Sequence, residues 1–228
     1  ALSTQTERHI MTVNTIQQTR AGTRFAIQAG GLIGAIGAAA SISGIVFMSD
    51  LTQREGARSP LSFTANVLIA VGFLIVALAL AGGSADLGMP RWAVLLSAAG
   101  CVMVAADAWG IATFGVETAR LVTDNQWEHP GVMLVVAFVP KMILCAVGFG
   151  TLAVVGWRNR TWSRGACILL GFGALVSALI APHQPGALVS GLALAWVARS
   201  AYPLERQPDA DSARRYSGNK SGNKVVGA

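Results

Sequence analysis

The sequence predicts an all-α, polytopic integral membrane protein with six transmembrane helices. Three observations support this fold class. First, 53% of the 228 residues are hydrophobic and only 12% are charged, whereas soluble domains average roughly 45–50% and about 25%. Second, six apolar segments approach the length that a helix needs to cross a hydrocarbon core of about 30 Å. Third, the basic residues gather on one side of the topology that these segments imply.

The first part of the chain combines a polar segment with an apolar span rich in small residues. Residues 1–23 are polar and lack the apolar centre of a cleavable signal, so we expect them to form a cytoplasmic segment. The predicted span at residues 24–48 has a small residue at every fourth position, which places these residues on one helix face. The face consists of Ala26, Gly30, Gly34 and Ala38.

This small-residue face has two interpretations. Small residues let two membrane helices approach closely, because lipid provides no hydrophobic drive between helices. The face can therefore pack on the protein's own helices, which is the commoner case, or it can be the docking site of a partner subunit. Both interpretations predict that the first span makes close helix contacts.

The other five predicted spans are separated by polar turns, several of which contain glycine or proline. These spans are residues 61–80, 91–116, 131–156, 165–181 and 186–202. The last two are the shortest, so a re-entrant pair is the alternative to two full crossings. The final segment, 203–228, is polar and basic and cannot bury a core, so we expect a disordered cytoplasmic tail.

The distribution of Lys and Arg predicts the orientation, because cytoplasmic loops retain positive charge. With six spans, thirteen basic residues lie on the side of both termini, and only Arg54, Arg58 and Arg120 lie opposite. We therefore expect both termini in the cytoplasm and a location in a bacterial-type inner membrane. This topology also accounts for the net charge of +6 without nucleic acid, so membrane lipids are the expected contacts.

Two charged residues stand inside predicted spans. Asp107 lies in the third span and Lys141 in the fourth. A charge at the bilayer centre costs roughly 2.5–3.5 kcal/mol on insertion scales, so such residues usually face the bundle and find partners. At about 1.5 Å per residue, their heights differ by roughly 7 Å, which a long lysine side chain can cover. Because consecutive spans are usually adjacent, we predict an Asp107–Lys141 ion pair, with Pro140 kinking the helix beside it.

Three further titratable residues lie toward the outer ends of the predicted spans. Glu117 follows Asp107 in the third span, and His129 and His183 lie in the outer connections. Together with Asp107 and Lys141 they are compatible with an outward-facing pathway for an ion, proton or substrate. The alternative is a purely structural ion pair with the other residues at the interface, and one pair alone favours this alternative slightly.

Motifs for common enzyme chemistries are absent from the sequence. The three histidines lie outside the apolar centres of the spans, which argues against axial haem ligands. HExxH, CxxC and phosphate-loop motifs do not occur. We therefore expect a non-enzymatic protein with no catalytic residue, metal site or cofactor. A lipid-modifying enzyme remains conceivable only through a cluster of Glu117, His129 and His183.

These expectations lead to two functional hypotheses. The first is a membrane subunit of a larger assembly that transports lipid or another apolar solute, with other membrane subunits as its partners. The second is a small transporter, or a membrane substrate-binding component, that uses Asp107 and Lys141 in an outward-facing cavity.

Overall fold

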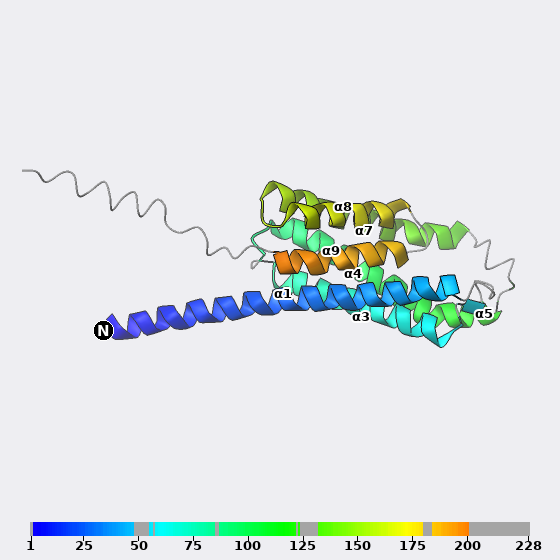
Figure 1. The fold of residues 1–228 in the computed structure, drawn as a ribbon, viewed down its shortest axis with the longest axis horizontal. Helices are drawn as coiled ribbons and strands as arrows, with labels where there is room; N and C mark the ends of the chain where they lie inside the picture. Colours follow the sequence, from blue (N-terminus) through cyan, green and yellow to red (C-terminus); the bar gives the residue numbers. More distant parts are fainter. Residues whose placement is uncertain are drawn as a thin grey trace, which may run out of the picture.

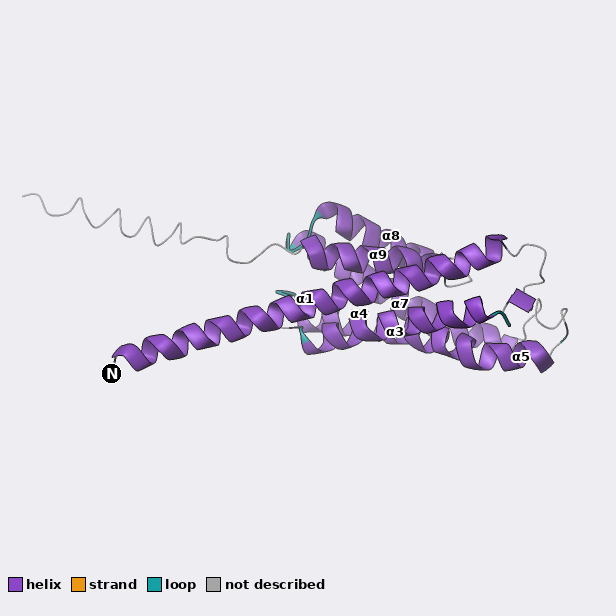
Figure 2. Ribbon diagram, turned by 60° about the horizontal axis from the view of Figure 1, so that its bottom comes forward, coloured by secondary structure: helices purple, strands orange, loops and turns teal. Residues whose placement is uncertain are grey.

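The computed structural model is built from α-helices that run nearly parallel and antiparallel (Figure 1). It describes residues 2–47, 55–56, 58–84, 87–121, 123, 132–179 and 184–200. Within these residues all regular structure is helical (Figure 2). The main helices are α1 (Leu2–Phe47), α3 (Pro60–Gly82), α4 (Arg91–Gly110), the π-helical turn η1 (Ile111–Gly115), α5 (Val116–Leu121), α7 (Val132–Arg158), α8 (Arg164–Leu179) and α9 (Gln184–Ser200).

Four of the described helical segments are long and apolar enough to cross a membrane. They are Gln18–Gly44, Pro60–Gly82, Arg91–Leu121 and Val139–Arg158. The segment Arg164–Leu179 is apolar but shorter. The chain therefore has the character of a membrane protein, and four of the predicted spans have the length and composition that a crossing requires.

Local sequence determines where several helices begin and end. Ser59 precedes Pro60 and accepts a hydrogen bond from the Ser62 backbone N–H at 3.1 Å, an N-cap followed by proline at the first helical position. Gly88, with φ 64°, supplies the left-handed turn that leads into α4. Ser163 caps α8 by accepting a hydrogen bond from the Ala166 N–H at 3.3 Å.

The helices form a closed ring in chain order. Each of α1, α3, α4, α7, α8 and α9 packs against the next, and α9 returns to α1. Two aromatic side chains fill part of the centre of the ring. Phe73 of α3 and Phe149 of α7 contact each other there, with ring centroids 6.4 Å apart. Both side chains are fully buried.

The ring has two chemically different ends. Arginines gather where α3, α7 and α9 end and where α4 and α8 begin, and we call this the basic end. Its described arginines on these helices and turns are Arg91, Arg158, Arg160, Arg164 and Arg199. The opposite end carries the start of α3, the end of α5 and the end of α8.

Helix α1 is much longer than the bundle. Its 46 residues span about 69 Å at about 1.5 Å per residue, more than twice a hydrocarbon core of about 30 Å. The amino-terminal part extends past the other helices in both views (Figure 1, Figure 2). The polar segment that precedes the first predicted span is thus helical and continuous with that span.

Helix α1 uses small residues on two faces. A Cβ atom on Gly30 would lie 2.6 Å from the Gly72 carbonyl oxygen of α3. On the other side, a Cβ on Gly31 would lie 2.6 Å from the Gly191 carbonyl oxygen of α9. Neither position tolerates a larger residue without a shift of backbone, so glycine permits both close approaches.

Candidate functional site

The candidate site lies between α4 and α7, where the two charged residues of the spans meet. The Lys141 Nζ atom lies 2.8 Å from the Asp107 Oδ2 atom. The Lys141 side chain is 9% exposed and that of Asp107 is 14% exposed. The ion pair predicted from the sequence is therefore present, and it is largely removed from solvent and lipid.

Both residues lie at the same height when it is measured from the basic end. Asp107 is about 24 Å along the helix from Arg91, and Lys141 is about 26 Å from Arg158, at about 1.5 Å per residue. Helix α7 has 27 residues and is about 40 Å long at about 1.5 Å per residue. It is therefore longer than the hydrocarbon core of about 30 Å on which the expected height difference of roughly 7 Å was based. The pair thus lies in the half of the bundle away from the basic end.

A π-helical turn follows Asp107 almost directly. Helix α4 changes to π geometry at Ile111–Gly115, and the Ile111 N–H contacts the carbonyl oxygens of both Asp107 and Ala108. Such single π turns are rare and are frequent at functional sites. No residue pattern in the sequence predicts this turn.

On the other side of the pair, Pro140 directly precedes Lys141 inside α7. Proline has no N–H, so it leaves the carbonyl group one turn earlier without its usual helical partner. Each charged residue therefore stands next to an interruption of the regular α-helical hydrogen bonds. Such interruptions are where helices bend at low cost.

Nearer the basic end, the same two helices are held together by small residues and neutral hydrogen bonds. The Ser97 hydroxyl donates to the Gly148 carbonyl oxygen at 2.7 Å, and the Cys145 thiol donates to the Gly100 carbonyl oxygen at 3.5 Å. A Cβ atom on Gly148 would lie 2.7 Å from the Leu96 carbonyl oxygen. The helices are thus in backbone contact below the ion pair.

Glu117 does not join the ion pair. Its Oε1 atom accepts a hydrogen bond from Arg120 Nη1 at 2.8 Å, and the two side chains are 62% and 61% exposed. Arg58, before α3, donates to the Ala119 carbonyl oxygen of α5. Glu117 therefore belongs to a surface ion pair at the end opposite the basic end. His129 and His183, the other members of the predicted outward-facing set, lie outside the described residues.

The small-residue face predicted on α1 lies mainly inside the bundle. Gly30, Gly34 and Ala38 are buried, and Ala26 is half-buried. A Cβ atom on Gly34 would meet the Phe73 ring of α3 at 2.9 Å. The packing interpretation accounts for this face, and a partner could reach it only if α1 left α3.

The described residues contain no group of three His, Cys, Asp or Glu side chains that could hold a metal ion. The ionisable groups that the described residues bring together between α4 and α7 are the Asp107 carboxylate and the Lys141 ammonium group, both largely buried. Comparisons with protein families, with characterised proteins and with solved structures found no match to the chain.

Proposed function

We propose that the protein is a multi-pass protein of a bacterial-type inner membrane, with six spans and with both termini in the cytoplasm. Four segments have the required length and apolar character, and α8 and α9 belong to the same closed ring of helices. The orientation is supported by the arginines of the basic end, since cytoplasmic loops retain positive charge. Arg58 and Arg120 are the described arginines of the opposite end.

Single-cysteine labelling in intact cells tests this topology. The background protein would have Cys101, Cys145 and Cys167, which are all buried, replaced by alanine or serine. Cysteines introduced at Arg160 and at Arg120 should then react oppositely with a membrane-impermeant maleimide, with only position 120 labelled from outside. Labelling of both positions, or of position 160 alone, would contradict the orientation.

Within this topology, the geometry best supports a small transporter, or a membrane substrate-binding component, for a lipid or another apolar solute. The observation that carries this proposal is the buried Asp107–Lys141 pair with an interrupted helix beside each charged residue. Charges inside a membrane bundle are costly and mark substrate or ion pathways. An ion pair between two helices that can both bend is able to separate. An ion pair that serves only to pack two helices does not require such irregularities beside it.

The arrangement suggests how opening would proceed. Below the pair, Ser97, Gly100 and Gly148 keep α4 and α7 in contact. Above it, Pro140 and η1 allow the two helices to bend apart once the ion pair breaks. A solute whose polar head group binds either charge would compensate the broken pair, because it replaces one buried partner by another. The apolar part of that solute would lie between the separated helix halves.

The experiment compares single and paired neutral variants of the two charges. The full-length protein would be purified in a mild detergent, and co-purifying lipids and small molecules would be identified by native mass spectrometry. The double variant Asp107→Asn, Lys141→Met removes both charges and leaves no buried charge without a partner. It should therefore fold but lose the bound solute. Ser97→Ala, which alters a neutral bond between the same helices, is the matched control and should retain it.

Two outcomes would contradict the transport proposal. One is a double variant that carries the same molecules in the same amounts as the unchanged protein. The other is equal loss from the double variant and from Ser97→Ala, which would indicate that general loosening of α4 from α7, rather than the charges, releases the solute.

A second candidate is a subunit of a larger membrane assembly. The observation that favours it is the part of α1 that extends past the bundle (Figure 1). An isolated helix gains little stability without tertiary packing, so a partner subunit would stabilise this extension. Deletion of residues 2–16 should then release a co-purifying protein while the bundle stays intact. Migration of the full-length protein as a monomer on a blue-native gel would argue against this candidate.

A further inference from the structure

The turn between α7 and α8 forms a pocket of about 670 Å³ at the basic end, and this pocket is open on one side. Six residues line it, all from this turn and the adjoining helix ends. They are Trp157, Arg158, Arg160, Trp162, Ser163 and Arg164. Among the described residues that line the pocket none is acidic, so the pocket combines positive charge with two indole rings.

The turn is closed by a pair of hydrogen bonds that place Arg160 in an unusual conformation. The Thr161 N–H donates to the Gly156 carbonyl oxygen, and the Arg160 N–H donates to the Trp157 carbonyl oxygen, both at 3.2 Å. This is a Schellman motif, and its left-handed position is usually occupied by glycine. Here Arg160 occupies it with φ 53°. The excess of positive charge in cytoplasmic loops would be met equally well by an arginine elsewhere in the turn. It therefore does not explain why arginine occupies this position.

The pocket walls are held in place by packing. Trp162 is 4% exposed and lies so close to Gly156 that a Cβ there would meet its ring at 2.6 Å. On the far side, the Trp196 ring of α9 would meet a Cβ on Gly165 at 2.9 Å. The backbone of the turn is thus packed between α7 and α9.

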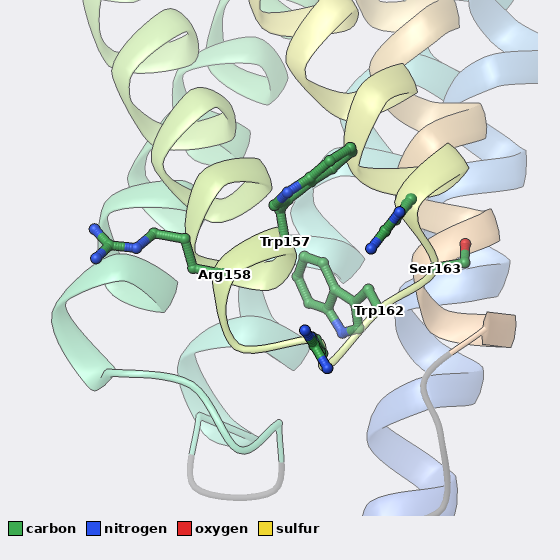
Figure 3. A pocket seen from close by; sticks show the side chains of 6 residues that line it. Trp157, Arg158, Trp162 and Ser163 are labelled. Carbon is green, nitrogen blue, oxygen red and sulfur yellow. The ribbon is translucent and has the colours of Figure 1, made fainter.

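The cations of the pocket have no carboxylate partner among the described residues. Arg164 instead lies over the Trp157 ring, with its guanidinium carbon 5.7 Å from the ring centroid. Figure 3 shows that the Arg158 side chain extends away from Trp157 and Trp162. Arg160 and Arg164, which are both exposed, are therefore the two cations that we assign to the lining of the pocket. The first backbone N–H groups of α8, which starts at Arg164, add positive potential there.

We propose that this pocket binds a phosphate group, and that the phosphate is carried by the head group of an anionic phospholipid. Guanidinium groups match phosphate in geometry and bind it through paired hydrogen bonds. Tryptophans at the membrane boundary place one face in the acyl region and one in the head-group region. Basic pockets between spans on the cytoplasmic side are suited to lipid head groups. This site is separate from the Asp107–Lys141 pair and requires only that α7 and α8 reach the membrane surface.

The test uses the full-length protein in a neutral detergent and native mass spectrometry. The protein would be titrated separately with phosphatidylglycerol, with phosphatidylcholine and with inorganic phosphate. Arg160→Gly is the informative variant, because glycine suits the left-handed position, so the turn is kept while the arginine side chain with its charge is removed. Arg91→Gln, which removes an exposed arginine at the same end but outside the pocket, is the matched control. Circular dichroism of each variant checks the fold.

We expect phosphatidylglycerol to bind more tightly than phosphatidylcholine, and Arg160→Gly to weaken its binding about tenfold, the effect of losing one charge-assisted hydrogen bond. Arg91→Gln should change the affinity less than about twofold, as a screened surface charge does. Inorganic phosphate should displace the lipid only at concentrations far above those of the lipid. Equal effects of the two variants, or no effect of Arg160→Gly on a folded protein, would overturn the proposal. Tight binding of inorganic phosphate alone would overturn the lipid as its source.

Discussion

The two halves of the α4–α7 interface are held together by different forces. Near the basic end, Ser97, Gly100 and Gly148 bring the helix backbones into contact through small residues and neutral hydrogen bonds. In the other half, an ion pair between Asp107 and Lys141 joins two helices that are both irregular, among the residues that the structure describes. The described contacts of the first half are mainly those of small residues in close packing, whereas those of the second half include a buried electrostatic contact.

This difference assigns separate roles to the two halves. Close-packed helices in lipid rarely separate, because every small-residue contact would be lost together. A buried ion pair can be exchanged for a pair with a ligand, since the cost of burying both charges has already been met. Under the transport proposal, the interface therefore combines a fixed part with a part that opens. Three substitutions test this division, in order of decreasing effect.

The largest effect is expected from breaking the ion pair on one side only. Lys141→Met leaves the Asp107 carboxylate buried without its ammonium partner, which should lower the free energy of unfolding by about 3–5 kcal/mol. Chemical denaturation in mixed micelles measures this change. Adding Asp107→Asn should recover most of the loss, because no buried charge then remains. If the double variant is no more stable than Lys141→Met alone, the contact does not have the energetic role assigned to it.

An intermediate effect is expected from adding one methyl group to the close-packed half. In Gly148→Ala the new Cβ would lie 2.7 Å from the Leu96 carbonyl oxygen, and such overpacking costs about 1–3 kcal/mol. Gly150→Ala is the control, because the nearest atom to its Cβ would be 4.0 Å away. Alanine favours a helix over glycine by about 1 kcal/mol, so the control should be neutral or slightly stabilising. The thermal unfolding temperature should therefore fall for Gly148→Ala and stay the same or rise for Gly150→Ala, and an equal fall in both variants would refute the close-packing argument.

The smallest effect is expected from Ser97→Ala. The Ser97 hydroxyl bonds to both the Ala93 and Gly148 carbonyl oxygens, and hydrogen bonds between membrane helices contribute about 0.6 kcal/mol on average. The unfolding free energy should decrease by about that amount, well below the effect of Lys141→Met. A loss as large as that of Lys141→Met would show that neutral hydrogen bonds, rather than shape, hold this half.

The ion pair was accessible to sequence reasoning because charges in apolar spans are rare and expensive. Asp107 and Lys141 stood out for that reason, and adjacent antiparallel spans left few other partners. Of the two helix interruptions beside these residues, the sequence predicts only one. Pro140 is visible in the sequence, but the π turn at Ile111–Gly115 results from how α4 meets its neighbours and has no residue signature.

Small-residue patterns predicted close packing but not where it occurs. The face at Gly30 and Gly34 was recognised from its spacing, yet the equally close contact of Gly31 with Gly191 was not. A glycine permits an approach from any direction, so the partner helix decides which glycines are used. The sequence likewise does not predict the left-handed conformation of Arg160, because arginine is not a residue that favours φ 53°.

The sequence by itself determined that apolar helices would dominate, which residues would lie at the basic end, and that Asp107 and Lys141 would form an ion pair. The first two properties follow from composition and periodicity within single segments, and the third follows from the adjacency of consecutive spans. The tertiary structure alone decided that the helices close into a ring, that both faces of α1 make close contacts, and that the start of α8 packs against Trp196 of α9. These features depend on the directions in which separate helices approach each other, and no single segment encodes those directions.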